Sequence, residues 1–221
     1  MRPRCALILV PTTRIIAIRH GQTDWNAEGR LQGQRDTALN ALGRRQAATL
    51  AGALRDEGLA VVISSDLGRA WHTAQALAAP LGLPLHAEPG LRERCFGGLQ
   101  GHTRAQIDQQ WPALARRWHS REPDFAPQGA ESLRDFSTRT LACVERLAAA
   151  HAGATMALVS HGGVLDCLYR AATRLALDAP RSWVMPNASI NRLLHTPQGL
   201  SLVGWNDGAH LDGLAQDDPA A

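Results

Sequence analysis

An arginine and a histidine stand side by side at the end of a short apolar run near the start of the chain. Residues 15–18 (Ile-Ile-Ala-Ile) predict a buried strand that stops at Arg19-His20-Gly21. Arginine carries a permanent charge on a planar fork of donors that fits phosphate oxygens, and a neutral histidine nitrogen can attack phosphorus. The pair therefore predicts a phosphate-binding site that contains its own nucleophile, and Gly21 lets the backbone turn sharply there.

Three further segments carry side chains that suit the same chemistry: two more strand ends, at residues 64–69 and 160–163, and a glycine-rich loop at residues 91–98. They contribute Arg69, His161 and Glu93. Because the carboxyl ends of neighbouring parallel strands open on one side of a sheet, we expect these residues to converge on the first segment. Each alone also has a structural explanation, as a helix-surface ion pair (Arg69), a hydrogen-bonded core histidine (His161) or a solvated charge (Glu93).

The elements that must position these residues alternate between strands and helices. Apolar patterning predicts strands over residues 15–18, 60–64, 83–88, 155–160, 189–195 and 201–205. It predicts helices over residues 42–57 with Asn40 as N-cap, 67–79 capped by Ser65-Asp66 and stopping at Pro80, 103–119 interrupted at Pro112, 131–150, and 162–175. Loops are expected over residues 24–39, 89–101 and 122–130. This order predicts an α/β fold, a three-layer sandwich with a largely parallel central sheet and helices on both faces.

The chain shows no internal repeat and no linker that would divide it. We expect a single domain over residues 13–207, preceded by a short extension, residues 1–12. The polar residues 208–221 are expected to form a frayed C-terminal tail.

Composition excludes several classes of function. All 23 basic residues are arginine, so a Walker-type phosphate loop and Schiff-base chemistry, which both need lysine, are excluded. The pI is about 9.0, but the arginines are scattered among acidic residues and aromatic residues are few. A nucleic-acid partner is therefore not expected, because such binding needs a clustered basic stripe or stacking platforms.

The cysteines and apolar segments indicate a cytoplasmic protein. Cys5, Cys95, Cys143 and Cys167 are far apart without zinc-ligand spacing, so we expect free, mostly buried thiols and no metal site. No apolar stretch approaches the ~20 residues of a membrane span. The run at residues 5–10 ends at Pro11 and is shorter than the ~7–15 residues of a signal-peptide core.

Four motifs in one order carry a family resemblance. They are RHGQTDWN (residues 19–26), SSDLGRAWHTA (64–74), LRERCFGGLQG (91–101) and VSHGGVL (159–165), with GQRDTALNALGRRQA (33–47) after the first. Together they resemble the histidine phosphatase superfamily, also called phosphoglycerate-mutase-like. The resemblance covers about residues 14–207 and is closest to the broad-specificity phosphatase and alpha-ribazole phosphatase branch.

The resemblance implies a role for each matched residue. His20 would be the nucleophile that becomes phosphohistidine, Glu93 the general acid, and His161 a third catalytic residue that holds the phosphate. The implied phosphate-binding residues are Arg19, Arg69, Asn26, Gln22, Thr23 and Gly162, where Gln22, Thr23 and Gly162 use their backbone. The family needs no metal, and no cofactor is expected for this chain.

Elementary physics fits these roles. Phosphoryl transfer needs an in-line nucleophile and positive charge around the equatorial oxygens, which Arg19, Arg69 and a protonated His161 would supply. Nearby arginines lower a histidine's pKa, which would keep His20 neutral, and we expect its second nitrogen to donate to a carbonyl or side chain. Glu93 would protonate the leaving alkoxide and then take a proton from the attacking water.

The sequence favours a metal-independent phosphoric monoester hydrolase over a mutase. The stretch from residue 101 to 131 is short, and residues 125–132 are similar to the corresponding segment of broad-specificity phosphatases. The alternatives are phosphoglycerate-mutase-type phosphotransfer, which Arg116, Arg117 and Arg121 favour unless they form a solvated helix face, and a non-catalytic phosphate-binding interaction module.

The sequence does not determine which substrate is preferred or what oligomer the chain forms. Leu99-Gln100 and Ala130 depart from the commoner family pattern in the loop that shapes substrate entry. The expected partner is a small phosphorylated metabolite, with sugar phosphates, phosphoglycerate, α-ribazole phosphate and nucleotides as candidates. No membrane partner is expected, and a homodimer stays open.

Overall fold

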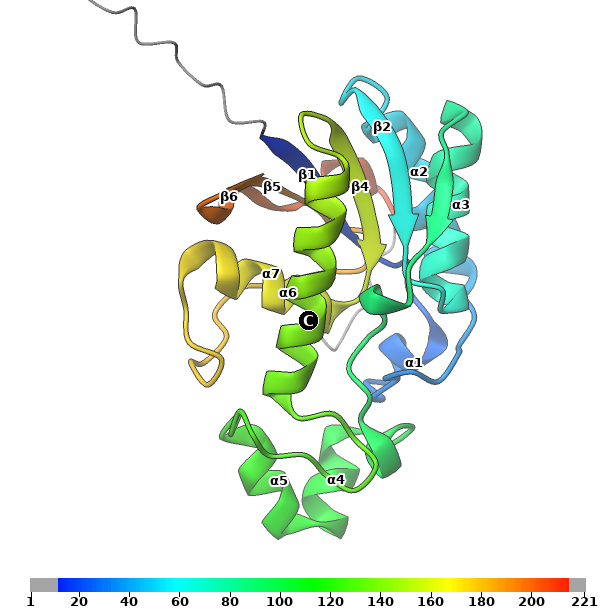
Figure 1. The fold of residues 1–221 in the computed structure, drawn as a ribbon. Coiled ribbons are helices and arrows are strands. Elements are labelled where there is room, and N and C mark those ends of the chain that lie inside the picture. The colour runs from blue at the N-terminus through cyan, green and yellow to red at the C-terminus, as the bar shows by residue number, and fades with distance from the viewer. Residues whose placement is uncertain (1–11, 215–221) are drawn as a thin grey trace, which may run out of the picture.

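The computed structural model describes residues 12–214 and contains a six-stranded sheet (Figure 1). The strands are β1 (Thr13–Arg19), β2 (Leu59–Ser64), β3 (Leu85–Ala87), β4 (Thr155–Ser160), β5 (Ile190–Thr196) and β6 (Gly199–Asp207), in the order β3-β2-β4-β1-β5-β6. The first four of that order pair in parallel, whereas β5 is antiparallel to both β1 and β6. The predicted largely parallel sheet is confirmed, and β1 and β4 end in register, with Arg19 opposite Ser160.

Helices cover both faces because the central strands are apolar on both sides. Ile15 and Ala17 of β1 belong to one core, which includes side chains of α6 (Leu133–Ala150) and α7 (Gly162–Thr173). Ile16 and Ile18 belong to the opposite core, which includes side chains of α2 (Ala41–Ala53) and α3 (Gly68–Leu81). Successive strand residues point to opposite faces, which explains the continuous apolar run. The predicted three-layer α/β sandwich is confirmed.

Two helices lie away from the sheet, at the lower end of Figure 1. They are α4 (Arg104–Gln110) and α5 (Pro112–His119), whose Ile107 and Ala115 form a small separate core with Leu99. Pro112 divides them as predicted, because a proline in a helix interior removes a hydrogen bond.

The predicted loop over residues 24–39 is wrong at its start, where the chain forms α1 (Asp24–Ala27). The cause is a reciprocal cap, in which the Thr23 amide donates to Asn26 Oδ1 at 3.2 Å and the Asn26 amide donates to Thr23 Oγ1 at 3.2 Å. Such a capping box stabilises a single turn that apolar periodicity does not reveal.

The ends of α3 also differ from the prediction. Neither Ser65 nor Asp66 is its N-cap; Leu67 is, and the Gly68 amide donates to Asp36 Oδ1 at 2.8 Å from a distant loop. The helix passes Pro80 by one residue and ends at Gly82, whose φ of 64° suits glycine. Helix α2 ends at Ala53, earlier than predicted.

The predicted frayed tail is wrong over its first residues. Residues Ala209–Leu211 form a 3-10 turn, and the Leu211 side chain is buried, with 2% of its surface exposed. The expected extension lies outside the described residues except for Thr12, as do Cys5 and residues 215–221. Within the described residues, Cys95, Cys143 and Cys167 are free thiols, and none of the helices is long and apolar enough to cross a membrane.

Candidate active site

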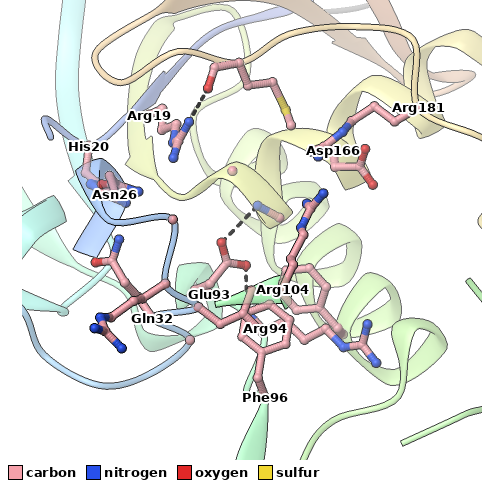
Figure 2. Close-up of a pocket in the computed structure, with 18 of the residues that line it drawn as sticks. Arg19, His20, Asn26, Gln32, Glu93, Arg94, Phe96, Arg104, Asp166 and Arg181 are labelled. Carbon is pink, nitrogen blue, oxygen red and sulfur yellow. Dashed lines mark hydrogen bonds between the residues drawn. The ribbon is translucent and has the colours of Figure 1, made fainter. Parts of the chain in front are cut away.

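A cavity of about 240 Å³ is lined by residues that follow β1, β2 and β4 (Figure 2). Arg19, His20, Arg69, Glu93 and Gly162 all contribute to its walls. The parallel strands end on one side of the sheet, so segments that are far apart in sequence meet there. The expected convergence of the four motifs is therefore what the structure shows.

His20 is buried and oriented by its two ring nitrogens. Nδ1 lies 2.7 Å from the Gly21 carbonyl oxygen, which can only accept, so Nδ1 carries the proton. Nε2 accepts a hydrogen bond from Arg69 Nε at 3.3 Å. Burial, and next the charges of Arg69 and Arg19, hold the pKa of His20 well below 6.5. The expected neutral ring, with its second nitrogen on a carbonyl, is what this environment produces.

His161 lies behind His20 and is fully buried. Its Nε2 is 2.9 Å from Ser65 Oγ, and the two histidine rings have centroids 5.1 Å apart. Burial lowers the pKa of His161 well below 6.5, and Arg69 and His20 add to this effect. The protonated His161 that we expect with phosphate bound stays a prediction, since the added negative charge of a phosphate dianion would raise this pKa.

Arg69 is almost fully buried and is held by the loop between α1 and α2. Its Nη1 donates to the Arg35 carbonyl at 2.8 Å and its Nη2 to the Gly33 carbonyl at 2.7 Å. Burial lowers its pKa to about 10, so it stays charged at neutral pH. Arg19 donates from Nη1 to the Met185 carbonyl at 2.5 Å. Both guanidinium groups are thereby fixed at the wall that His20 shares.

The remaining phosphate-binding candidates divide into two groups. Asn26 and Gly162 line the cavity, and Gly162 begins α7. Gln22 and Thr23 are buried and are absent from the cavity wall. Their amides donate to Gln46 Oε1 and Asn26 Oδ1, at 2.9 and 3.2 Å. Their backbone contacts with phosphate stay predictions. In this arrangement the two amides hold the Gln46 and Asn26 side chains.

Glu93 is clamped by two backbone amides. Its Oε1 accepts from the Arg94 amide at 2.8 Å, and its Oε2 accepts from the Gly163 amide in the first turn of α7 at 3.0 Å. A Cβ at Gly163 would lie 2.1 Å from Glu93 Oε1, so glycine is needed for this approach. The carboxylate therefore sits at a helix N-terminus beside the cavity, separated along the wall from His20 (Figure 2).

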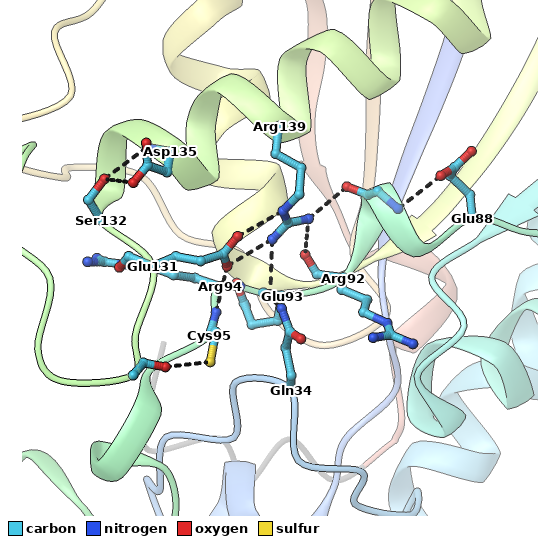
Figure 3. Close-up of polar contacts among 12 residues, drawn as sticks. Gln34, Glu88, Arg92, Glu93, Arg94, Cys95, Glu131, Ser132, Asp135 and Arg139 are labelled. Carbon is cyan, nitrogen blue, oxygen red and sulfur yellow. Dashed lines mark hydrogen bonds and ion pairs between the residues drawn. The ribbon is translucent and has the colours of Figure 1, made fainter.

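Arg139 of α6 fixes the Glu93 loop from outside (Figure 3). Its guanidinium donates to the carbonyls of Gly90, Arg92 and Glu93, at 2.9, 3.2 and 3.5 Å. It also forms two hydrogen bonds with Glu131, whose Oε2 accepts from the Cys95 amide at 2.8 Å. Sequence reasoning missed this pair, because both residues look like ordinary charges at the start of an amphipathic helix.

The wall on the other side of Glu93 from His20 is rich in charge, and only Arg121 among its charged residues was weighed in the sequence. Arg94, Arg104, Arg121, Arg181 and Asp166 line it. Of the three arginines weighed in the sequence, only Arg121 reaches the cavity. Arg117 is exposed and pairs with Glu122, which agrees with a solvated face. Among residues 12–214, no group of three or more His, Cys, Asp or Glu side chains is arranged to hold a metal ion.

Comparison with known proteins identifies the class. The family model for the histidine phosphatase superfamily (branch 1) matches residues 15–208, and the chain belongs to this family. Its fold is shared by a solved structure of Bacillus stearothermophilus YhfR, which is 30% identical with a TM-score of 0.84 and covers 90% of this chain and 100% of that one.

Named relatives add the type of activity. A metal-independent phosphoserine phosphatase of Arabidopsis thaliana is 35% identical over 91% of this chain and 84% of the relative. The solved structure of mycobacterial glucosyl-3-phosphoglycerate phosphatase is 34% identical, with a TM-score of 0.79, over 89% of this chain and 100% of that one. A probable phosphoglycerate mutase GpmB of Yersinia enterocolitica is 33% identical over 93% of this chain and 98% of the relative. Phosphatase-named relatives within this family support a phosphatase enzyme.

Proposed function

We propose that this chain hydrolyses phosphomonoesters of small metabolites through a phosphohistidine on His20, without a metal. The observation that carries the proposal is the state of His20: it is neutral, its proton is fixed on Nδ1 by the Gly21 carbonyl, and its Nε2 is directed to the arginine side of the cavity. A neutral imidazole with a fixed tautomer is the form that can attack phosphorus.

The first chemical step transfers the phosphoryl group to His20. Nε2 forms a bond to phosphorus while the bond from phosphorus to the ester oxygen breaks. Arg19 and Arg69 stabilise the charge on the equatorial oxygens, and Arg69 exchanges its bond to Nε2 for one to phosphate. Glu93, entering the step protonated, gives its proton to the leaving oxygen.

The second step returns the enzyme to its starting state. Water attacks the phosphohistidine, the bond between Nε2 and phosphorus breaks, and Glu93 takes a proton from the water. Inorganic phosphate leaves and His20 is again neutral. His161, hydrogen-bonded to Ser65, supports the His20 ring and gains charge as phosphate negative charge accumulates beside it.

The test compares phosphate release by wild type, His20→Ala and His86→Ala after EDTA treatment, on a panel that includes p-nitrophenyl phosphate, phosphoserine and 3-phosphoglycerate. His86 is an exposed histidine of β3 and serves as the matched control. Activity in wild type and His86→Ala, lost in His20→Ala, is expected. Rapid acid-free quenching of a reaction with 32P-labelled substrate should trap an acid-labile, alkali-stable label on His20. Undiminished turnover by His20→Ala would overturn the proposal.

A phosphoglycerate mutase activity is the second candidate. The relatives named as probable mutases favour it, and so do the arginines at the far wall, which suit a second acidic group. 31P NMR of 3-phosphoglycerate with a 2,3-bisphosphoglycerate primer separates the two, because a mutase accumulates 2-phosphoglycerate and a phosphatase accumulates phosphate.

A further inference from the structure

A buried carboxylate at the far wall of the cavity has one oxygen that the fold leaves unused. Asp166 lines the cavity and is 5% exposed. Its Oδ2 accepts from Arg170 Nε at 2.9 Å and from Arg121 Nη2 at 3.0 Å. Its Oδ1 is buried and accepts no hydrogen bond.

An ion-pairing role explains only half of this arrangement. Oδ2 alone pairs with Arg170, one turn further along α7, and with Arg121, which also donates to the Leu177 carbonyl at 2.9 Å. A buried acceptor without a donor is destabilising, so a native protein that keeps one calls for an explanation. Trp183, which lines the same cavity, has an indole N–H that is likewise buried and unpaired. An unused acceptor and an unused donor on the wall of one cavity indicate a ligand that supplies both partners.

The position of Asp166 places that ligand group on the leaving-group side. Asp166 follows Gly162 and Gly163 by one turn of α7, about 5 Å along the helix, on the same face. Gly163 holds Glu93, which would protonate the leaving oxygen. Figure 2 shows His20 and Asn26 on one side of Glu93, and Asp166 with Arg181 on the other. A phosphomonoester bound at His20 therefore extends its leaving group past Glu93 toward Asp166.

The charge of this wall defines the rest of the leaving group. Arg104 and Arg181 line the cavity here, are exposed, and have no carboxylate partner among the described residues. Their long, exposed side chains can change rotamer to give an entering group room at this wall. Positive charge outweighs the single carboxylate, so an anionic group fits beside the donor that Oδ1 requires.

We propose that Asp166 determines specificity by accepting a hydrogen bond from a hydroxyl or ammonium group of the leaving group. The neighbouring arginines would bind a carboxylate of the same leaving group. The favoured substrates are thus phosphorylated hydroxy acids or amino acids. This inference rests on the proposed hydrolysis at His20, and it adds a contact that no phosphate-binding residue makes.

The test uses substrates that differ only in the donor. Phosphoserine and 3-phosphoglycerate carry an ammonium or hydroxyl group, and 3-(phosphonooxy)propanoate has hydrogen in its place. Wild type should show a kcat/KM on the order of 10- to 100-fold higher for the donor-bearing substrates, as expected for a hydrogen bond to a buried charge. Equal kcat/KM for all three overturns the proposal without any variant.

Asp166→Asn then assigns the preference to this side chain. Two arginines require an acceptor at the Oδ2 position, so the amide NH₂ takes the Oδ1 position and presents a donor where an acceptor stood. The preference for phosphoserine should fall to within about threefold, because its ammonium can only donate, while p-nitrophenyl phosphate hydrolysis changes far less. Asp124→Asn, an exposed arginine-paired aspartate, is the matched control and should keep the preference. A folded Asp166→Asn that retains the wild-type preference refutes the assignment.

Binding separates this inference from the proposed hydrolysis. Calorimetry on His20→Ala gives the Kd ratio of phosphoserine to 3-(phosphonooxy)propanoate without turnover. Preferential binding with no hydrolysis by wild type would refute the phosphatase mechanism and retain the Asp166 contact. Hydrolysis with equal Kd and equal kcat/KM would retain the mechanism and refute the contact.

Discussion

Replacing Gly163 by alanine tests whether the position of Glu93 limits catalysis. The new Cβ would lie 2.1 Å from Glu93 Oε1, whereas ordinary contacts begin at 3.4 Å, so the oxygen must retreat by about 1.3 Å. Gly163 is helical with a negative φ, so alanine fits its backbone. The substitution therefore displaces one carboxylate while the helix keeps its geometry.

A displacement of this size is large for proton transfer. A misplacement of ~1 Å can cost ~100-fold in rate, equal to about 2.7 kcal/mol in transition-state free energy. The retreating carboxylate also stretches its bond from the Gly163 amide, now 3.0 Å. We expect kcat/KM for alkyl phosphates, whose leaving groups need a proton, to fall by roughly 100-fold. p-Nitrophenolate leaves without one, so its ester should lose less than about fivefold.

The assay compares kcat/KM of Gly163→Ala for phosphoserine and p-nitrophenyl phosphate with that of wild type. Gly98→Ala is the matched control, because Gly98 is exposed and its added Cβ meets nothing within 4 Å. Phe136 Cε1, at 3.1 Å, must also yield slightly, so thermal unfolding of Gly163→Ala is measured in parallel. An equal loss on both substrates, or none on either, would refute the reasoning.

Three further outcomes follow from other parts of the structure. The folded-state pKa values of His20 and His161 are well below 6.5, so the unfolded chain binds more protons than the folded protein below that pH. The free energy of unfolding should therefore fall by about 1.4 kcal/mol for each histidine between pH 7.5 and 5.5. Urea titrations of wild type and His161→Asn check this, and an unchanged pH dependence in the variant would contradict it. Arg139→Met should lower activity on alkyl phosphates more than on p-nitrophenyl phosphate and show no added effect in a Glu93→Gln background, as a double-mutant cycle can measure. Gly52→Ala fills open space within α2 and should raise the free energy of unfolding by ~0.5–1 kcal/mol in a denaturant titration, with activity unchanged.

Local patterns in the sequence were enough to predict the elements that carry the chemistry. The apolar run before Arg19 identifies β1 because a strand buried on both faces is continuously apolar. His20, Arg69 and Glu93 follow from motifs at strand ends and in the glycine-rich loop, and the structure brings them to one cavity. His161 was placed in the right cluster, but its burial, which lowers its pKa, depends on packing that the sequence does not display.

Interactions between distant segments could not be predicted in this way. Asp36 caps α3 from more than thirty residues away, and no local pattern links the two. Arg139 and Asp166 look like ordinary charges on amphipathic helices, because their partners are a backbone loop in one case and a cavity wall in the other. Such residues become visible only when the fold shows which carbonyls and cavities they face.

The way α4 and α5 are attached has a consequence for protein engineering. The segment that carries them, residues 104–129, is flanked by two isolated β-bridges, Arg30 with Thr103 and Phe96 with Ala130. Both ends of this segment are therefore fixed beside the catalytic loops. Residues 104–129 can be exchanged as a cassette without cutting any strand of the sheet. The exchange must keep the links of this segment to the rest of the fold. Arg121 links it to Leu177 and Asp166, and the Phe125 carbonyl accepts from Arg94 at 3.3 Å. A transplanted cassette that supplies an arginine there would import a new entrance while the chemistry at His20 stays in place.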